Sequence, residues 1–232
     1  MLKSTSLEVL FLCYSSVMMT QVFILGSSMV YGVGGSQGGW ADLIKQHLHQ
    51  KMYGDDALGE KYEIYNFGKS GATIDFVKDT FMSQLGAYGR KQKTVIVLAV
   101  GGNNTKAEEQ PDNFVSTPEE YEKEMRELLA LLKENSDGLI FVGSNNYVDE
   151  TKTNPKLNPL TGGRSYFTNS RRQQFAGIVK QICADLDVTL VDVTVEKEKW
   201  LSSYIYKDGL HPNDAGHQLI FEAIKPALDK HL

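Results

Sequence analysis

Five short apolar runs alternate along the chain with segments of helical length, and this alternation limits the fold more than any other feature. The apolar runs fall at residues 22–25, 62–66, 94–100, 138–143 and 188–193. The expected helices lie near residues 37–52, 74–88, 118–134, 168–186 and 213–230. Apolar runs of this length between helices are typical of parallel strands that are covered on both faces. The sequence therefore predicts an α/β fold with a five-stranded parallel sheet, and no linker divides it.

Composition and charge are those of an ordinary globular chain, and they exclude some partners. The 232 residues are 41% hydrophobic and carry a net charge of −5, which is sufficient for one sizeable core. The acidic balance argues against nucleic acid as the main partner, since that partner requires a basic surface. Cys13 and Cys183 make neither a disulfide framework nor a CxxC metal motif. We therefore expect no metal or other cofactor, and a reducing, cytoplasmic compartment. No pattern indicates an oligomeric state.

The first 19 residues are expected to form a non-essential N-terminal extension, followed by a single domain over residues 20–232. Lys3 and the apolar stretch 7–19 imitate a secretory signal peptide. However, Glu8 interrupts this stretch, and no small-x-small cleavage site follows it before the first apolar run. The stretch is also too short and too polar to span a bilayer. An extension is therefore favoured over a targeting signal, although secretion stays open.

The first apolar run ends in Gly26-Ser27-Ser28, and this segment is the first candidate for chemistry. Ligands of open α/β sheets bind at the carboxyl ends of the strands. A serine at this position can act as a nucleophile if a base reaches its hydroxyl. The alternative is a plain turn, because serine and glycine are common in turns.

A histidine that could serve as this base lies in the loop before the last expected helix. Asp208 and His211 are three residues apart, so one tight turn could hold the carboxylate against one ring nitrogen and leave the other nitrogen free. The same spacing recurs at Asp214 and His217. That second pair falls inside the expected helix, where we interpret it as a surface contact. We therefore favour Asp208 and His211.

Two segments rich in glycine and asparagine could supply hydrogen-bond donors to an oxyanion. They follow the second and third apolar runs, at residues 66–71 and 101–104. Glycine lets a backbone N–H approach a ligand closely, and an asparagine amide is a neutral donor. Each segment taken alone is equally typical of an ordinary turn. Four strand ends that carry a serine, a glycine, an asparagine and an Asp/His pair argue together against four plain turns.

These four segments, in this order, resemble the sequence blocks of the SGNH (GDSL-type) hydrolases, a family of serine esterases and lipases. Gly26-Ser27-Ser28 resembles the Gly-Asp-Ser block, and residues 66–71 and 101–104 resemble the second and third blocks. The segment from Asp208 to Pro212 resembles the D-x-x-H-P block. The likeness covers nearly the whole chain after residue 22. It implies a flavodoxin-like three-layer α/β/α sandwich.

The resemblance also implies a role for each site residue. Ser28 would be the nucleophile, His211 its base and Asp208 the carboxylate that orients the histidine. The N–H groups of Ser28 and Gly71 and the Asn103 amide would hold the oxyanion, and loss of one such donor costs roughly 100- to 1000-fold in turnover. The implied reaction is hydrolysis of a small carboxylic ester through an acyl-enzyme. An acetylated carbohydrate is one candidate substrate.

Two departures from the family pattern keep other functions open. Ser27 stands where the family usually has an aspartate before the nucleophile, and Asn104 stands where it has one after the asparagine. Neither position belongs to the triad, but both help to position turns. The first alternative is therefore a non-catalytic module that binds a sugar or acyl group in the same pocket. The second is an acyltransferase, which uses the same acyl-enzyme.

Three further features have ordinary explanations. Gly32 and Gly34 follow the first run, but the third glycine of a dinucleotide fingerprint would fall at Gln37. His47 and His49 are two apart on an expected helix and point to different sides, so we interpret them as solvated surface and not as metal ligands. The polar segment after the fourth run, residues 145–168, is either a solvated loop or a segment that contacts substrate.

Overall fold

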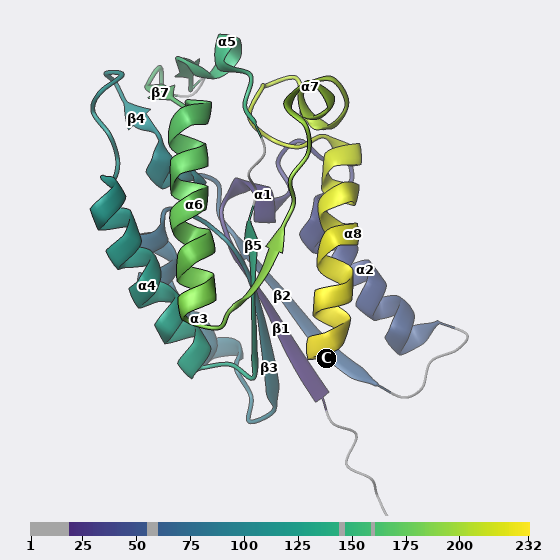
Figure 1. Ribbon diagram of the computed structural model, residues 1–232. Helices are drawn as coiled ribbons and strands as arrows, with labels where there is room; N and C mark the ends of the chain where they lie inside the picture. Colours follow the sequence, from purple (N-terminus) through teal and green to yellow (C-terminus); the bar gives the residue numbers. More distant parts are fainter. Residues whose placement is uncertain (1–18, 55–59, 144–146, 159–160) are drawn as a thin grey trace, which may run out of the picture.

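A five-stranded parallel sheet lies between two layers of helices in the computed structural model of the protein, which describes residues 19–54, 60–143, 147–158 and 161–232 (Figure 1). The strands are β1 (Met19–Gly26), β2 (Lys61–Gly68), β3 (Lys93–Ala99), β5 (Gly138–Gly143) and β8 (Thr189–Asp192). One layer contains α2 (Trp40–Tyr53) and α8 (Asp214–His231), and the other contains α3 (Ile74–Tyr88), α4 (Pro118–Glu134) and α6 (Asn169–Asp185). The predicted three-layer sandwich is confirmed.

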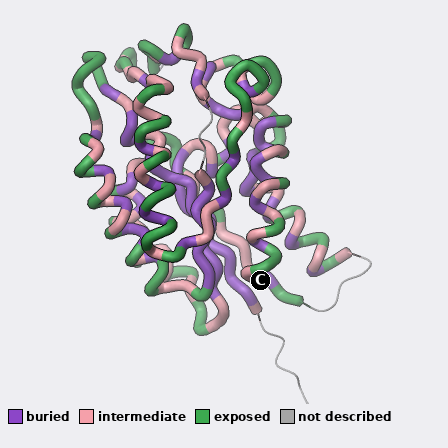
Figure 2. Tube along the Cα trace, in the orientation of Figure 1, coloured by how far each residue is buried: buried purple, intermediate pink, exposed green. Residues whose placement is uncertain are grey.

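Burial on both faces of the sheet explains why the strands are continuously apolar. In β1, Val22 and Ile24 pack with α2 and α8, whereas Phe23 and Leu25 pack with α3, α4 and α6. All four side chains are at most 1% exposed, and Figure 2 shows the same burial along the centre of the sheet. Full burial of such a side chain is worth about 1.5–3 kcal/mol. A polar residue at any of these four positions would face a helix layer and not water.

The first strand is longer than its apolar run. It begins at Met19 and includes Thr20 and Gln21, both of which are buried. The Gln21 amide donates to the Tyr88 carbonyl at 2.9 Å and accepts from the Arg90 N–H at 2.9 Å. A polar residue can therefore continue a buried strand because its partners come from a distant turn. Met19 thus belongs to the sheet and not to the predicted extension, and residues 1–18 of that extension lie outside the described residues.

The order of the strands in the sheet is β2-β1-β3-β5-β8, with every pair parallel. The chain leaves β1 toward one neighbour, β2, and returns to the other, β3. The connections therefore diverge at the carboxyl ends of β1 and β3, which is where open α/β sheets bind their ligands. None of the helices that the structure describes is long and apolar enough to cross a membrane.

Several short elements at the carboxyl edge of the sheet were not predicted. A three-stranded antiparallel sheet joins β4 (Ala107–Glu108), β7 (Arg164–Tyr166) and β6 (Lys156–Leu157) in the order β4-β7-β6. The other short elements are the helix α1 (Ser28–Tyr31), the 3-10 turn η1 (Gly102–Thr105), α5 (Glu150–Thr153), α7 (Lys197–Lys199) and the π turn η2 (Trp200–Tyr204). Strands of two or three residues are too short to show a period. The described part of segment 145–168 therefore contains structure where the sequence predicts only a loop.

Candidate active site

A tight turn after β1 presents Ser28 at the carboxyl edge of the sheet. Gly26 has a φ of +148°, and a Cβ there would lie 2.0 Å from the Ala99 carbonyl oxygen, so only glycine fits. The Ser27 N–H donates to that same oxygen at 3.2 Å, which ties the turn to β3. Ser28 then begins α1 with its side chain half-buried. The glycine of the motif is therefore explained by a close approach of two strands.

The hydroxyl of Ser28 contacts a histidine that lies far away in the sequence. The distance from Ser28 Oγ to His211 Nε2 is 2.8 Å, and the distance from His211 Nδ1 to Asp208 Oδ2 is 2.6 Å. His211 is only 9% exposed. The structure thus brings together the serine, histidine and aspartate that the sequence singles out. In this arrangement, Nδ1–H donates to the carboxylate and the lone pair of Nε2 faces the hydroxyl.

The Asp208 carboxylate is held by its own loop. Its Oδ1 atom accepts from the backbone N–H groups of Leu210 at 3.0 Å and His211 at 3.1 Å. Burial by itself raises the pKa of Asp208. The hydrogen bonds from the His211 ring and from the two N–H groups outweigh burial and hold this pKa well below its ordinary value. The carboxyl group is therefore an anion at neutral pH.

Two candidate oxyanion donors lie in the turns after β2 and β3. The Asn103 side-chain amide donates to the Ala72 carbonyl at 2.9 Å, which orients the amide and leaves its second N–H available. Gly71 has a φ of +84°, and nothing lies within 4 Å of the position of a Cβ. This glycine is therefore required by its backbone conformation and not by crowding. Within the described residues, no protein acceptor is recorded for the N–H groups of Ser28 and Gly71.

The Asn104 departure from the family pattern is accommodated. The Asn104 side chain is 2% exposed, its oxygen accepts from the Ile74 N–H at 3.1 Å, and its amide donates to Ser116 Oγ at 3.0 Å. Asparagine therefore satisfies both a donor and an acceptor here, without the cost of burying a charge. This side chain ties the turn after β3 to the start of α3.

The interpretation of the second D-x-x-H pair as a surface contact is wrong for His217. His217 is 1% exposed; its Nδ1 accepts from the Trp40 N–H at 3.3 Å, and its Nε2 lies 3.1 Å from the Val33 carbonyl. Asp214 accepts from the N–H of Ser36 at 2.6 Å. Both residues therefore hold the segment between α1 and α2. The His217 contacts require a neutral ring, with the proton on Nε2.

The neutral state of His217 predicts a loss of stability in mild acid. Burial, together with the nearby His211, lowers the pKa of His217 in the folded protein despite the Val33 contact. The unfolded chain therefore binds a proton first, and the free energy of unfolding falls as pH drops below about 6.5. This group contributes a slope of at most about 1.4 kcal/mol per pH unit. We expect His217→Gln to make the free energy of unfolding depend less steeply on pH, as measured by urea unfolding between pH 8 and pH 5.

His231 also has a pKa lowered by burial, so only the difference between the wild type and the variant isolates His217. His49→Gln, at an exposed position on α2, provides the matched control. If the free energy of unfolding fell equally steeply with pH in the wild type and in His217→Gln, the assignment of this effect to His217 would be contradicted.

The two histidines of α2 have different surroundings. His47 contacts Asp229 of α8 at 3.0 Å and is partly buried, whereas His49 is exposed. Within the described part of the chain, no group of three or more potential metal ligands occurs.

One charged contact to the site was not predicted from the sequence. Lys156 Nζ lies 3.2 Å from Asp208 Oδ2 and 3.1 Å from the Asp208 carbonyl oxygen. Lys156 is in the two-residue strand β6, within the segment interpreted as a solvated or substrate-contacting loop. No motif surrounds it, so only its position in space identifies it.

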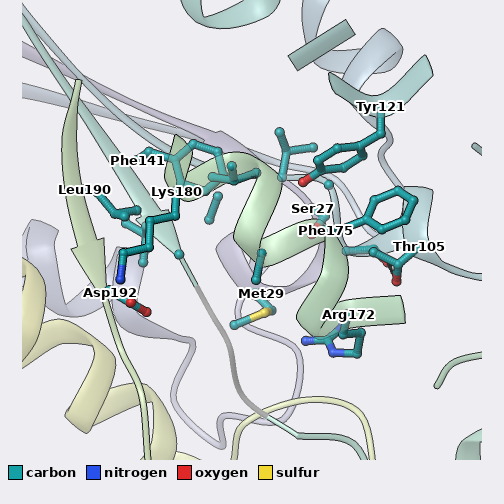
Figure 3. A pocket seen from close by; sticks show the side chains of 18 residues that line it. Ser27, Met29, Thr105, Tyr121, Phe141, Arg172, Phe175, Lys180, Leu190 and Asp192 are labelled. Atoms are coloured by element: carbon teal, nitrogen blue, oxygen red, sulfur yellow. Dashed lines mark hydrogen bonds between the residues drawn. The ribbon is translucent and has the colours of Figure 1, made fainter. Parts of the chain in front are cut away.

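A small pocket lies beside the turn that carries Ser28, between α6 and the ends of the central strands (Figure 3). It has a volume of about 90 Å³. Ser27, Met29 and Gly102 line it on the side of the site, and Tyr121 and Phe175 make part of its apolar wall. Charged side chains also line it: Arg172, Lys180 and Asp192. Burial lowers the pKa of Arg172 to about 10, which still leaves this group protonated at neutral pH.

Comparisons with known proteins agree with this fold. Residues 24–219 match the model of the GDSL-like lipase/acylhydrolase family, whereas no curated protein sequence matches the chain. The structure is similar to the lipase/acylhydrolase from Enterococcus faecalis, with a TM-score of 0.69 and 15% identity over 91% of this chain and 96% of that one. It is also similar to Axe2, an acetylxylan esterase from Geobacillus stearothermophilus, with a TM-score of 0.63 and 21% identity over 90% and 94% of the two chains. Because the family model matches most of this chain, the chain belongs to the GDSL-like lipase/acylhydrolase family and is a carboxylic ester hydrolase.

Proposed function

We propose that the protein hydrolyses small carboxylic esters through a Ser28–His211–Asp208 triad and an acyl-enzyme intermediate. The observation that carries the proposal is the 2.8 Å contact between Ser28 Oγ and His211 Nε2, which is within the range needed for proton transfer. His211 takes the hydroxyl proton as Ser28 attacks the ester carbonyl, and it then protonates the departing alcohol. Water activated by the same ring releases the acid. Asp208 orients the ring and stabilises its charged form.

The negative charge that develops on the carbonyl oxygen needs fixed donors. We propose that the N–H groups of Ser28 and Gly71 and the Asn103 amide supply them. The bond from Asn103 to the Ala72 carbonyl supports this role, because an amide held in advance has little reorganisation to undergo during the reaction.

We propose that the pocket beside Ser27 receives a short acyl group. Its volume of about 90 Å³ corresponds to roughly six water-sized groups, so we infer that it has room for an acetyl or butyryl group. Two structures with this fold are acetylxylan esterases by name, one of them from Geobacillus stearothermophilus. An acetylated carbohydrate is therefore our first candidate substrate.

A serine-directed probe tests whether the site is catalytic. We expect a fluorophosphonate to label the folded protein once, on the peptide that contains Ser28, because only a serine activated by a base reacts quickly with such reagents. Mass spectrometry after proteolysis locates the label, and the Ser28→Ala variant is the control. No labelling of a folded protein would favour a non-catalytic binding module.

A substrate panel then separates the remaining possibilities. We expect turnover to fall steadily along p-nitrophenyl esters from acetate to palmitate, with release of acetate from acetylated xylan or other acetylated sugars. Added alcohol distinguishes hydrolysis from acyl transfer, since a transferase forms the new ester as its main product. A rise in turnover with chain length would overturn the short-acyl proposal.

We also propose a cytoplasmic location and a non-essential N-terminal extension. The two cysteines form no extracellular framework, and β1 begins only at Met19. Cell fractionation with N-terminal sequencing of the recovered protein tests the location, and recovery from a secreted fraction, cleaved ahead of β1, would contradict it. Loss of activity in a chain that begins at Met19 would contradict the non-essential extension.

A further inference from the structure

A segment after β5 packs directly against the loop that carries Asp208 and His211. The Asp149 N–H donates to the Gly209 carbonyl at 2.9 Å. A Cβ at Gly209 would lie only 2.9 Å from Lys152 Cβ and 3.1 Å from Asp149 Cβ. The backbone of the loop is therefore enclosed by α5 and the residue before it. This enclosure brings the next residues of the segment to Asp208.

Lys156 makes two contacts to Asp208 from the end of this segment. Its Nζ atom lies 3.2 Å from Oδ2, the carboxylate oxygen that accepts from His211 at 2.6 Å, and 3.1 Å from the Asp208 carbonyl. The side chains of Lys156 and Asp208 are 27% and 21% exposed. The lysine thus holds both the backbone and the carboxylate of one residue, in partial shelter from water.

The small antiparallel sheet fixes the backbone of Lys156. Lys156 pairs with Ser165 of β7, and Tyr166 of β7 pairs with Ala107 of β4. β4 follows closely after Asn103 in the turn that ends β3. The sheet therefore connects the Asn103 side of the site to the Asp208 side. This connection therefore fixes the backbone position from which the long Lys156 side chain extends.

We propose that Lys156 is a positioning residue, which holds Asp208 against His211 and keeps the histidine unprotonated further into acid. This inference rests on the proposed function, because it assigns a role within the same triad. Lys156 and His211 share one carboxylate oxygen, so their nitrogens are no more than about 6 Å apart. A positive charge at that distance disfavours a second positive charge on the ring.

Within the described residues, four groups face His211 or its partner Asp208. Asp208 lies on its own loop, Ser28 is on α1, His217 is on α8, and Lys156 approaches through Asp208 from β6. Among these groups, Lys156 is the one permanent cation. Its removal leaves the carboxylate to stabilise the charged ring alone, so the acid limb of the pH–rate profile moves to higher pH. We expect a shift of about 0.5–1 pH unit.

The test measures the pH dependence of kcat/KM for p-nitrophenyl acetate in four variants. Lys156→Met removes the charge and the donor, whereas Lys156→Gln removes the charge but retains a donor, which guards against a folding defect in the first. We expect both to shift the acid limb upward, and Lys156→Met to lower kcat/KM about tenfold through loss of positioning. Lys156→Arg keeps the charge and should restore both properties. Lys106→Met, which removes a lysine paired with Glu108 beside the same small sheet, is the matched control.

A second readout separates this inference from the proposed function. In protein labelled with [15N]histidine, the His211 ring signal is assigned by its loss in His211→Asn, and its titration midpoint is compared between the wild type and Lys156→Gln. If the wild type hydrolysed no ester, the proposed function would fail, but this titration would still decide the role of Lys156. An unshifted midpoint in Lys156→Gln, or an equal shift in Lys106→Met, would overturn the inference. A loss of activity in Lys156→Gln without a change in the His211 titration midpoint would also overturn it.

Discussion

Replacing Ser28 with alanine is expected to reduce kcat for p-nitrophenyl acetate by about 10⁵- to 10⁶-fold. Removal of a serine nucleophile eliminates the acyl-enzyme route, and the remaining acceleration comes only from binding and from the oxyanion donors. The fold should not change, because within the described part of the chain His211 is the one hydrogen-bond partner of Ser28 Oγ. Steady-state kinetics, with circular dichroism to verify folding, measures the effect.

The adjacent serine provides the control. Ser27→Ala removes a hydroxyl one residue away while the contact of Ser28 with His211 remains, so we expect it to retain at least about a tenth of the wild-type turnover. Unchanged turnover in Ser28→Ala, or an equal loss in Ser27→Ala, would mean that the nucleophile has been assigned to the wrong residue.

Replacing Asp208 with asparagine is expected to reduce kcat by about 10⁴-fold, although the side chain keeps its shape. The loop decides how the new amide lies. The N–H groups of Leu210 and His211 both donate to Oδ1, so the amide oxygen must occupy that position. The NH₂ group then faces His211 Nδ1 and requires it to accept. The ring proton moves to Nε2, which faces Ser28 and can no longer remove its proton.

Kinetics on the folded Asp208→Asn variant tests this argument, and the second D-x-x-H pair offers a matched control. Asp214→Asn changes an equivalent carboxylate that contacts Ser36 and not the site, so we expect turnover within about fivefold of the wild type. Activity of Asp208→Asn within tenfold of the wild type would rule out the orienting role of Asp208.

The main elements of the fold could be predicted because their signals are local. Phe23 and Leu25 face one layer and Val22 and Ile24 face the other, so a strand buried on both faces is visible as an unbroken apolar run. Helix starts such as Thr117, whose hydroxyl accepts from the Glu120 N–H at 3.2 Å, are equally local. By contrast, β4, β6 and β7 depend on pairing between distant segments, and a pattern of two or three residues does not predict that pairing.

The sequence by itself determined the parallel sheet, the strand ends that carry Ser28, Gly71 and Asn103, and the two candidate Asp/His pairs. These features follow from residue type and spacing over a few positions. Only the tertiary structure decided which pair meets the serine, since Asp208/His211 and Asp214/His217 have the same spacing but occupy different surroundings. It also decided that Lys156 contacts Asp208 from 52 residues away. The physical reason is that a hydrogen bond depends on a few tenths of an ångström, and such distances between remote residues are set by the packing of the whole sheet and its helices.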